Sequence, residues 1–289
     1  MRIVLAIGAL AVCLGACTAC GASSTAAGGR TTVVAAFYPL AWAAEVIGGS
    51  SVDVQNLTPA GAEPHDVELK PREVAELQRA DVVLYLSHGF QPAVEEATKA
   101  ATGKRIDVLT GIGLKPGVGD EAGKTDPHVW LDPVLYARVV RRIGAALGKP
   151  KPAAKLAARV LALNAEYRTG LAHCSSNEFV TSHAAFGYLA ARYGLHQLAI
   201  TGIDPSSEPS PKRLAELAKL VREKHISTVF FERLVSPKLA EAVAREAGVK
   251  TAVLDPIEGL TPSEASAGDT YLTIMRHNLS ELRQVLHCR

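Results

Sequence analysis

The sequence lacks several features that mark large classes of proteins. Lysine and arginine number 31 against 29 acidic residues, so the formal net charge is only +2. Proteins that bind nucleic acids are usually strongly basic, and this chain is not. A net charge this close to zero also predicts no strong attraction to acidic membrane surfaces. Aromatic residues make up just 5% of the chain. Neither HExxH nor, beyond residue 20, CxxC occurs, so no short motif identifies a metal site by itself.

No apolar run is long enough to span a membrane. The run at residues 3–14 has 12 residues, whereas a spanning helix needs about 20. Arg2 precedes this run, and a short apolar segment behind a positive charge is typical of a secretory signal peptide. The segment ends in Leu14-Gly15-Ala16-Cys17, which resembles the lipobox of bacterial lipoproteins, where the cysteine is acylated and becomes the first residue.

The resemblance to a lipobox implies a lipid anchor at the start of the mature chain. We expect residues 1–16 to be a removed signal peptide, and residues 17–30 to form the anchor, at Cys17, and a flexible tether rich in Ala, Gly and Ser. Cys20 offers a second frame but lacks the aliphatic residue three positions upstream, so we prefer Cys17. A plain cleaved signal with incidental cysteines is the alternative. With the anchor, the protein would be attached to the cell membrane on its extracytoplasmic face, in a periplasm or at the cell surface.

Beyond the leader, the chain carries two cysteines, Cys174 and Cys288. Export would place them in an oxidising compartment, where two lone cysteines tend to pair. We therefore predict a disulfide that joins the end of the chain to its second half. Two buried free thiols are the alternative, and alkylation of both without reductant would exclude the bridge.

Short β-rich runs alternate with helical stretches in both halves of the chain. In the first half we expect strands at residues 31–37, 52–57, 82–86 and 106–109. In the second half we expect them at residues 179–181, 196–200, 228–231 and 251–254. Strands that alternate with helices argue for parallel sheets covered by helices. The sequence thus predicts an α/β fold with two lobes, each with a parallel sheet flanked by helices.

A long helical region separates the two halves. Asp132 and Pro133 are typical of an N-cap followed by proline at the first helical position. A second helical stretch, residues 153–172, would be about 30 Å long. We therefore expect an N-terminal lobe at residues 31–150, a linking helix at residues 151–174 and a C-terminal lobe at residues 175–289. One long, rigid helix between two lobes would leave little freedom for hinge motion.

Three of the nine histidines and one aspartate lie at the ends of predicted strands or before a helix. His65 is in the loop after a strand, His128 directly precedes a capped helix, His183 ends a strand, and Asp255 follows one. Ligands of open α/β sheets bind outside the carboxyl ends of the strands. Three neutral imidazoles and one carboxylate suit four-coordinate Zn²⁺, whereas Mn²⁺ prefers more oxygen ligands. Spacing alone does not decide the point, because each histidine by itself could be a cap or a hydrogen-bonded polar group.

Four ordered motifs supply the missing information. They are Pro64-His65-Asp66, Asp126-Pro127-His128-Val129-Trp130, Thr181-Ser182-His183 and Leu254-Asp255-Pro256. With them, residues 31–287 resemble the zinc/manganese solute-binding proteins of ABC importers, the metal-binding lipoprotein family sometimes called cluster 9 or cluster A-I. The resemblance implies two α/β lobes joined by one long helix, with the metal in the cleft on His65, His128, His183 and Asp255. Zinc members usually carry histidine as the third ligand and manganese members glutamate, so His183 indicates the zinc branch.

The function implied by the resemblance is capture of Zn²⁺ and its delivery to an importer. The expected partners are the importer's permease and its ATPase, and we expect a monomer. Uptake of Mn²⁺ or Fe²⁺ is the main alternative, and a metal-binding adhesin and an exported zinc hydrolase are the others. Four protein ligands would leave no open position for a reacting water, so we predict no enzyme activity.

Two further features refine this prediction. Glu232 follows the strand at residues 228–231 and could hydrogen-bond a liganding imidazole, which would fix its tautomer. A simple strand-end carboxylate is the alternative. Many zinc members carry a histidine-rich loop before the second histidine motif, but residues 113–125 contain no histidine. Metal capture is therefore expected at the cleft site alone.

Overall fold

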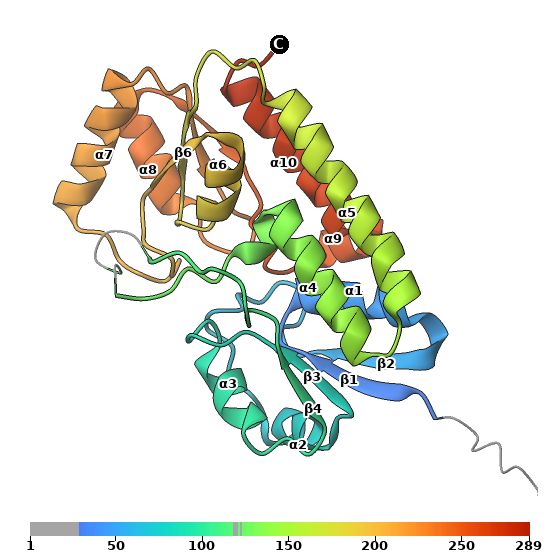
Figure 1. Ribbon diagram of the computed structural model, residues 1–289. Coiled ribbons are helices and arrows are strands. Elements are labelled where there is room, and N and C mark those ends of the chain that lie inside the picture. The colour runs from blue at the N-terminus through green and yellow to red at the C-terminus, as the bar shows by residue number, and fades with distance from the viewer. Residues whose placement is uncertain (1–28, 118–120, 122) are drawn as a thin grey trace, which may run out of the picture.

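Two parallel β-sheets form the framework of the computed structural model, which describes residues 29–117, 121 and 123–289 (Figure 1). The first sheet has the order β2-β1-β3-β4, and its strands are β1 (Thr31–Ala35), β2 (Val52–Asn56), β3 (Val82–Tyr85) and β4 (Lys104–Asp107). The second has the order β6-β5-β7-β8, and its strands are β5 (Glu178–Thr181), β6 (His196–Ala199), β7 (Thr228–Phe231) and β8 (Lys250–Val253). The predicted α/β fold with two sheets is confirmed. The segment expected to be a signal peptide, Cys17 and most of the expected tether lie outside the described residues.

Helices flank both sheets, as the alternating pattern predicts. Those of the first lobe are α1 (Tyr38–Gly48), α2 (Pro71–Arg79) and α3 (Pro92–Thr98). Those of the second are α6 (Gly187–Tyr193), α7 (Pro211–Glu223), α8 (Lys238–Ala247) and α9 (Pro262–Ala267). The sequence does not predict α3 and α9, because each is about two turns or less and too short to show a clear helical period.

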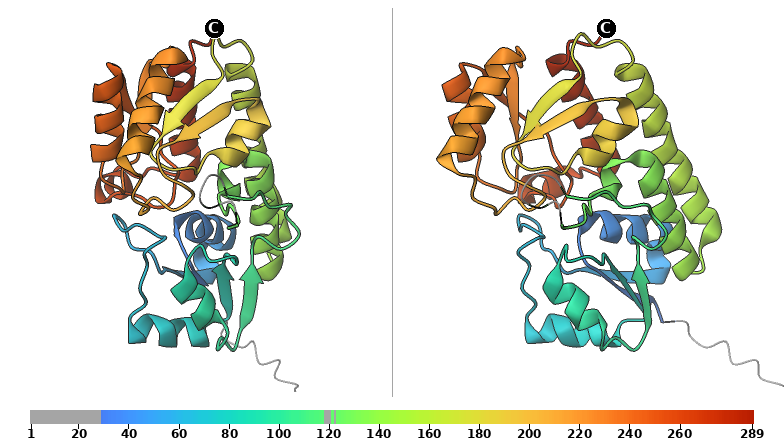
Figure 2. Two further views of the ribbon diagram at one scale, coloured as in Figure 1. Left: turned by 90° about the vertical axis from the view of Figure 1, so that its left-hand side faces the viewer. Right: turned by 60° about the vertical axis from the view of Figure 1, so that its left-hand side comes forward.

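Three long helices pack together on one side of the molecule (Figure 1 and Figure 2). They are α4 (Pro133–Ala146), α5 (Pro150–Gly170) and α10 (Tyr271–Val285). Helix α5 begins three residues earlier than predicted, because prolines are tolerated in the first turn of a helix, where backbone N–H groups have no helical partner. The hydroxyl of Tyr167 in α5 donates to the carbonyl of Met275 in α10 at 2.6 Å. The lobe boundaries proposed from the sequence remain predictions.

A disulfide joins Cys174, just beyond α5, to Cys288, just beyond α10. The predicted pairing is therefore present, and it fastens the end of the chain to the start of the second lobe. Within the described part of the chain, no helix combines the length and the apolar character needed to cross a membrane.

The carboxylate of Asp132 joins α4 to the second lobe. It accepts from the backbone N–H of Val134 at 2.8 Å and forms a two-pronged ion pair with Arg192 of α6, with N–O distances of 2.6–3.0 Å. Because both the cap and the ion pair are lost, Asp132→Ala should lower the free energy of unfolding by about 1–2 kcal/mol, measured by urea denaturation. Asp132→Asn keeps the capping oxygen and should lose less. An alanine variant as stable as the natural protein would contradict this role.

Candidate metal centre

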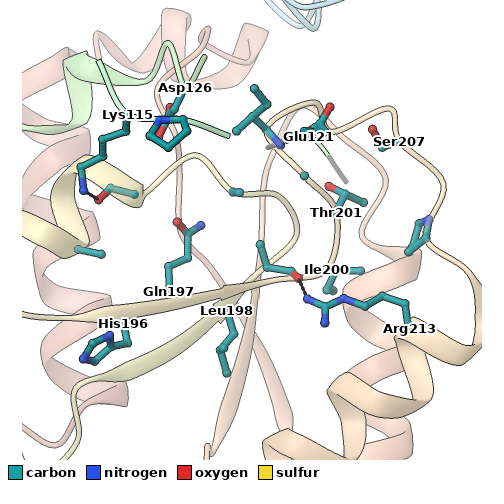
Figure 3. Close-up of a pocket in the computed structure, with 18 of the residues that line it drawn as sticks. Lys115, Glu121, Asp126, His196, Gln197, Leu198, Ile200, Thr201, Ser207 and Arg213 are labelled. Carbon is teal, nitrogen blue, oxygen red and sulfur yellow. Dashed lines mark hydrogen bonds between the residues drawn. The ribbon is translucent and has the colours of Figure 1, made fainter. Parts of the chain in front are cut away.

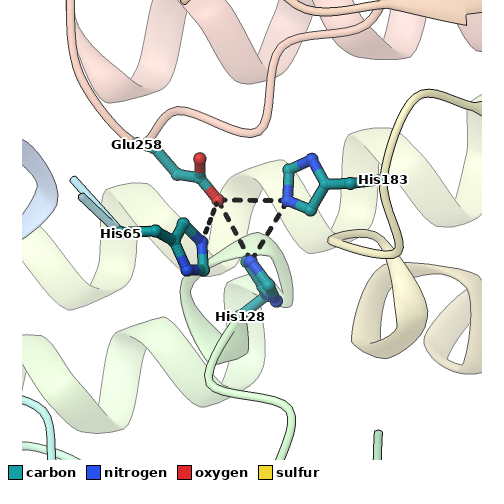
Figure 4. Close-up of side chains that lie close together, drawn as sticks. All are labelled: His65, His128, His183 and Glu258. Carbon is teal, nitrogen blue, oxygen red and sulfur yellow. Dashed lines mark hydrogen bonds and ion pairs between the residues drawn. The ribbon is translucent and has the colours of Figure 1, made fainter. Parts of the chain in front are cut away.

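Four side chains from four separate segments meet between the two lobes (Figure 4). His65, His128, His183 and Glu258 each offer a ligand atom, and these atoms all lie within 4.8 Å of one another. The Oε1 atom of Glu258 is 3.0 Å from Nε2 of His128, 3.3 Å from Nε2 of His183 and 3.5 Å from Nε2 of His65. The side chains of His128 and His183 are fully buried, and that of His65 is 8% exposed. Three imidazoles thus face one carboxylate oxygen in a site closed to solvent.

The order of the strands explains why these segments converge. In the second sheet, β5 and β7 are the central strands, and the chain leaves them toward opposite edges. Such a switch point opens a crevice beyond the carboxyl ends of the strands, and His183 follows β5 there. His65 lies in the loop between β2 and α2 of the first sheet, and His128 comes just before the short 3-10 helix Val129–Leu131.

Carboxylates hold the far side of two of the imidazole rings. Nδ1 of His128 is 2.8 Å from Oδ1 of Asp126, and Nδ1 of His183 is 2.7 Å from Oε1 of Glu232. When Nδ1 of each ring carries the proton and donates it to the carboxylate, the lone pair of Nε2 is free to bind a metal. The carboxylate also makes Nε2 more basic. Glu232 follows β7, beside β5, so the position suggested by the sequence puts it against His183. Its effect on metal binding remains a prediction.

The charges of the cluster depend strongly on one another. Burial by itself would lower the pKa of His128, but the carboxylates of Asp126 and Glu258 raise it above the ordinary histidine value. Burial likewise opposes the charge of His183, yet Glu232 and Glu258 raise its pKa well above that value. Burial opposes ionisation of Glu258 too, but the histidines hold its pKa well below the usual range. A metal that binds here must therefore displace protons from His128 and His183.

A second acidic side chain close to the cluster behaves differently. Burial, reinforced by the charge of Glu258, raises the pKa of Glu63 to about 9. One carboxyl oxygen of Glu63 accepts from the backbone N–H of His65 at 3.1 Å. With Glu63 neutral near pH 7, Glu258 supplies the negative charge that faces the three imidazoles.

The structure does not bring Asp255 into this group, although the sequence suggested it as the fourth ligand. One oxygen of Asp255 accepts from the backbone N–H of Ile257 at 2.7 Å, and the other lies 3.8 Å from Nε of Arg233. The turn that follows β8 places Glu258 at the histidines instead. A sequence signal for Glu258 does exist: this carboxylate lies in the otherwise uncharged stretch 256–263, and a buried carboxylate needs partners.

Aromatic rings wall the cluster on the side of the first lobe. The ring centroids of Trp130 and His128 are 5.0 Å apart, and those of Phe90 and His65 are 4.6 Å apart. The indole N–H of Trp130 donates to the carbonyl of Pro256 at 2.7 Å, which ties the loop of His128 to the loop of Glu258. Because these rings exclude water, the local dielectric constant is low, which strengthens the interaction between a bound cation and its ligands.

A larger hollow of about 1020 Å³ lies beside the cluster, next to β6 and α6 (Figure 3). Its basic side chains are already engaged: Nζ of Lys115 donates to the carbonyl of Gly187, and Arg213 donates to the carbonyl of Ala199. Asp126 lines this hollow but turns one oxygen toward His128. The convergent donor atoms that a metal needs lie in the histidine cluster, which is therefore the candidate site.

Known zinc-binding proteins are similar in sequence to this chain. The zinc-binding protein AdcA of Streptococcus pyogenes serotype M3 is 38% identical over 286 residues, which covers 88% of this chain and 56% of AdcA. The high-affinity zinc uptake system protein ZnuA of Bacillus subtilis is 35% identical and is covered over 87% of its length. The chain thus spans little more than half of the AdcA relatives and most of the Bacillus protein.

Solved structures of several metal-binding proteins share the fold of this chain. Zn(II)-bound AdcA from Streptococcus pneumoniae superimposes with a TM-score of 0.77 at 36% identity, over 89% of this chain and 58% of that one. The laminin binding protein Lmb of Streptococcus agalactiae, described as a bifunctional protein with adhesin and metal transporting activity, gives 0.80 at 32%, over 89% and 99%. The family model for zinc-uptake complex component A, periplasmic (ZnuA), matches residues 33–285. The chain therefore belongs to the ZnuA family.

Proposed function

We propose that this chain is an extracytoplasmic solute-binding lipoprotein that captures one Zn²⁺ ion and delivers it to an ABC importer. The ion would be held by Nε2 of His65, His128 and His183 and by a carboxylate oxygen of Glu258. The observation that carries the proposal is the convergence of three buried imidazoles on one carboxylate oxygen within 3.5 Å. The zinc-binding names of the relatives support it.

The donor set favours zinc over manganese. Three imidazole nitrogens and one carboxylate oxygen match the four-coordinate preference of Zn²⁺, whereas Mn²⁺ is usually bound by more oxygen atoms. A site with nitrogen ligands generally binds Fe²⁺ with lower affinity than Zn²⁺. Uptake of Mn²⁺ or Fe²⁺ is therefore the less favoured alternative.

The same donor set argues for carriage rather than catalysis. Catalytic zinc sites usually have three protein ligands and leave a fourth position for water or substrate. Here a fourth protein group, Glu258, faces the three histidines, and it is 1% exposed. An exported zinc hydrolase would need a zinc-bound water and room for a substrate beside it, which four protein ligands would not leave.

Delivery requires that the site open, and the contacts suggest which side opens. The hydroxyl of Tyr188 in α6 donates to the carbonyl of Asp126 at 2.9 Å, so the His128 loop is bonded to the second lobe. His183 and Glu258 belong to that lobe as well. His65 approaches from the first lobe, and for its loop to withdraw, the bond from the N–H of Gly61 to the carbonyl of Leu260, at 2.8 Å, would have to break. Loss of the His65 contact would leave three ligands and a weaker hold on the ion. The permease and ATPase of the importer would receive it at the membrane, where Cys17 would anchor the protein.

Zinc should stabilise the folded protein without being required for folding. At a free zinc concentration one hundred times the Kd, a ligand that binds the native state alone adds about 2.7 kcal/mol. For a chain of this size that corresponds to a rise in Tm of about 5 °C, measured by thermal denaturation with and without chelator. The metal-free protein should remain folded and rebind zinc, with Mn²⁺ giving a smaller rise. Unfolding on chelation would favour an adhesin that holds zinc only as a structural element.

A further inference from the structure

The backbone of Asp255 is held tightly where the chain leaves β8. The N–H of Asp255 donates to Oδ1 of Asn278 in α10 at 2.9 Å, and Nδ2 of Asn278 donates back to the carbonyl of Asp255 at 2.6 Å. Both residues are buried. This pair of bonds fixes one end of the turn that leads to Glu258.

The next residues of the turn have an uncommon conformation. Ile257 is fully buried and has a φ of 56°, in the left-handed region that is costly for a β-branched side chain. The N–H of Ile257 donates to the carboxylate of Asp255 at 2.7 Å, as in an Asx-turn. Such a conformation persists only where its surroundings hold it, and the carboxylate of Asp255 supplies the bond that does so.

Two further contacts hold the same turn from outside. The carbonyl of Pro256 accepts from the indole N–H of Trp130, two residues beyond His128. Arg233, the residue after Glu232, places Nε 2.9 Å from Oε1 of Glu264 and 3.8 Å from Oδ2 of Asp255. The turn is thereby tied to the segments that carry His128 and Glu232.

We infer that Asp255 is a positioning residue for zinc binding: its carboxylate holds Ile257 in the left-handed conformation and so directs Glu258 at the three histidines. This inference rests on the proposed function, since it concerns the affinity of the same site. Binding groups must be held to within about 0.5 Å of their working geometry. Without the carboxylate of Asp255, Ile257 relaxes toward negative φ, and Glu258, the next residue, moves away from the imidazoles.

The test compares the zinc affinity of Asp255→Ala, Asp255→Asn and Ser210→Ala with that of the natural protein, by competition with a zinc chelator. Loss of an outer partner of a ligand typically weakens metal binding by about 10–100-fold, which is the loss expected for Asp255→Ala. Asp255→Asn keeps an oxygen for the N–H of Ile257 and should recover at least about tenfold of that loss. Ser210→Ala removes the N-cap of α7 and lowers stability away from the site, so its zinc affinity should be unchanged.

A double-mutant cycle separates positioning from a general loss of structure. In a Glu258→Gln background, Asp255→Ala should weaken zinc binding by less than about threefold, because the charged group that it positions is already gone. If the full loss persists there, or if Asp255→Ala binds zinc as tightly as the natural protein, the inference is wrong. If the natural protein itself fails to bind zinc, the proposed function fails instead.

Discussion

Replacing His128 or His183 by alanine is expected to weaken zinc binding by about a hundred- to a thousandfold. Binding to a four-ligand zinc site in small zinc domains is worth about 10–16 kcal/mol, so an even share is about 2.5–4 kcal/mol for each ligand, and 1.4 kcal/mol is tenfold. Both rings are fully buried, and each has a carboxylate on Nδ1 that fixes its orientation. The measurement is competition for zinc against a chromophoric chelator.

The matched control for this pair is His277→Ala. His277 is exposed on α10 and is not among the converging histidines, so its replacement should leave zinc affinity unchanged. The Tm of each variant should also be measured in the presence of chelator. Loss of an imidazole leaves Asp126 or Glu232 without its partner and can lower stability independently of zinc. Unchanged zinc affinity in both the His128 and His183 variants would show that the ion binds elsewhere.

Glu258→Gln should reduce zinc affinity by at least about tenfold more than Asp255→Asn. Glutamine keeps the size of the side chain and one oxygen but removes the negative charge that three imidazoles face at 3.0–3.5 Å. Asparagine at position 255 keeps an acceptor for the N–H of Ile257, so the turn and Glu258 should stay close to their places. Chelator competition measures both variants under the same conditions.

The order of these two effects decides which carboxylate binds the ion. If Asp255→Asn weakened zinc binding more than Glu258→Gln, Asp255 would be the fourth ligand, as the sequence first suggested. X-ray absorption of the zinc-loaded variants gives an independent readout, because loss of the carboxylate ligand changes the shell of light atoms around zinc in one variant and not the other.

Local sequence places the three histidines near strand ends or a helix start, and the resemblance of their motifs to a metal-binding family singles them out, whereas neither identifies Glu258. His183 follows β5 by two residues and His128 lies shortly before the capped helix α4, so both are at the crevice between the lobes. The fourth position depends on Ile257, whose left-handed φ no propensity for isoleucine would predict. Asn278 and Trp130, which are distant in the chain, hold that turn: Asn278 exchanges two hydrogen bonds with the backbone of Asp255, and Trp130 donates one to Pro256. The sequence therefore indicates an acidic residue after β8, but it suggests Asp255, whereas the structure places Glu258 at the histidines.

A similar division applies to the fold. The alternation of strands and helices along the sequence predicts the two sheets. Export to an oxidising compartment predicts the Cys174–Cys288 bridge. Local pattern fails where elements are short or begin unusually. Helix α9 has six residues and is held by the capping box of Thr261 and Glu264, and α5 begins at Pro150, before the helical stretch expected at residues 153–172. In these places capping bonds and tertiary contacts outweigh intrinsic preference.

The most direct test of the zinc site is a crystal structure of the protein equilibrated with equal Zn²⁺ and Mn²⁺, with anomalous data at both metal edges. We predict one peak at the zinc edge, about 2.0–2.2 Å from Nε2 of His65, His128 and His183 and from a carboxylate oxygen of Glu258. Manganese in that position, or zinc bound away from these four side chains, would contradict the account.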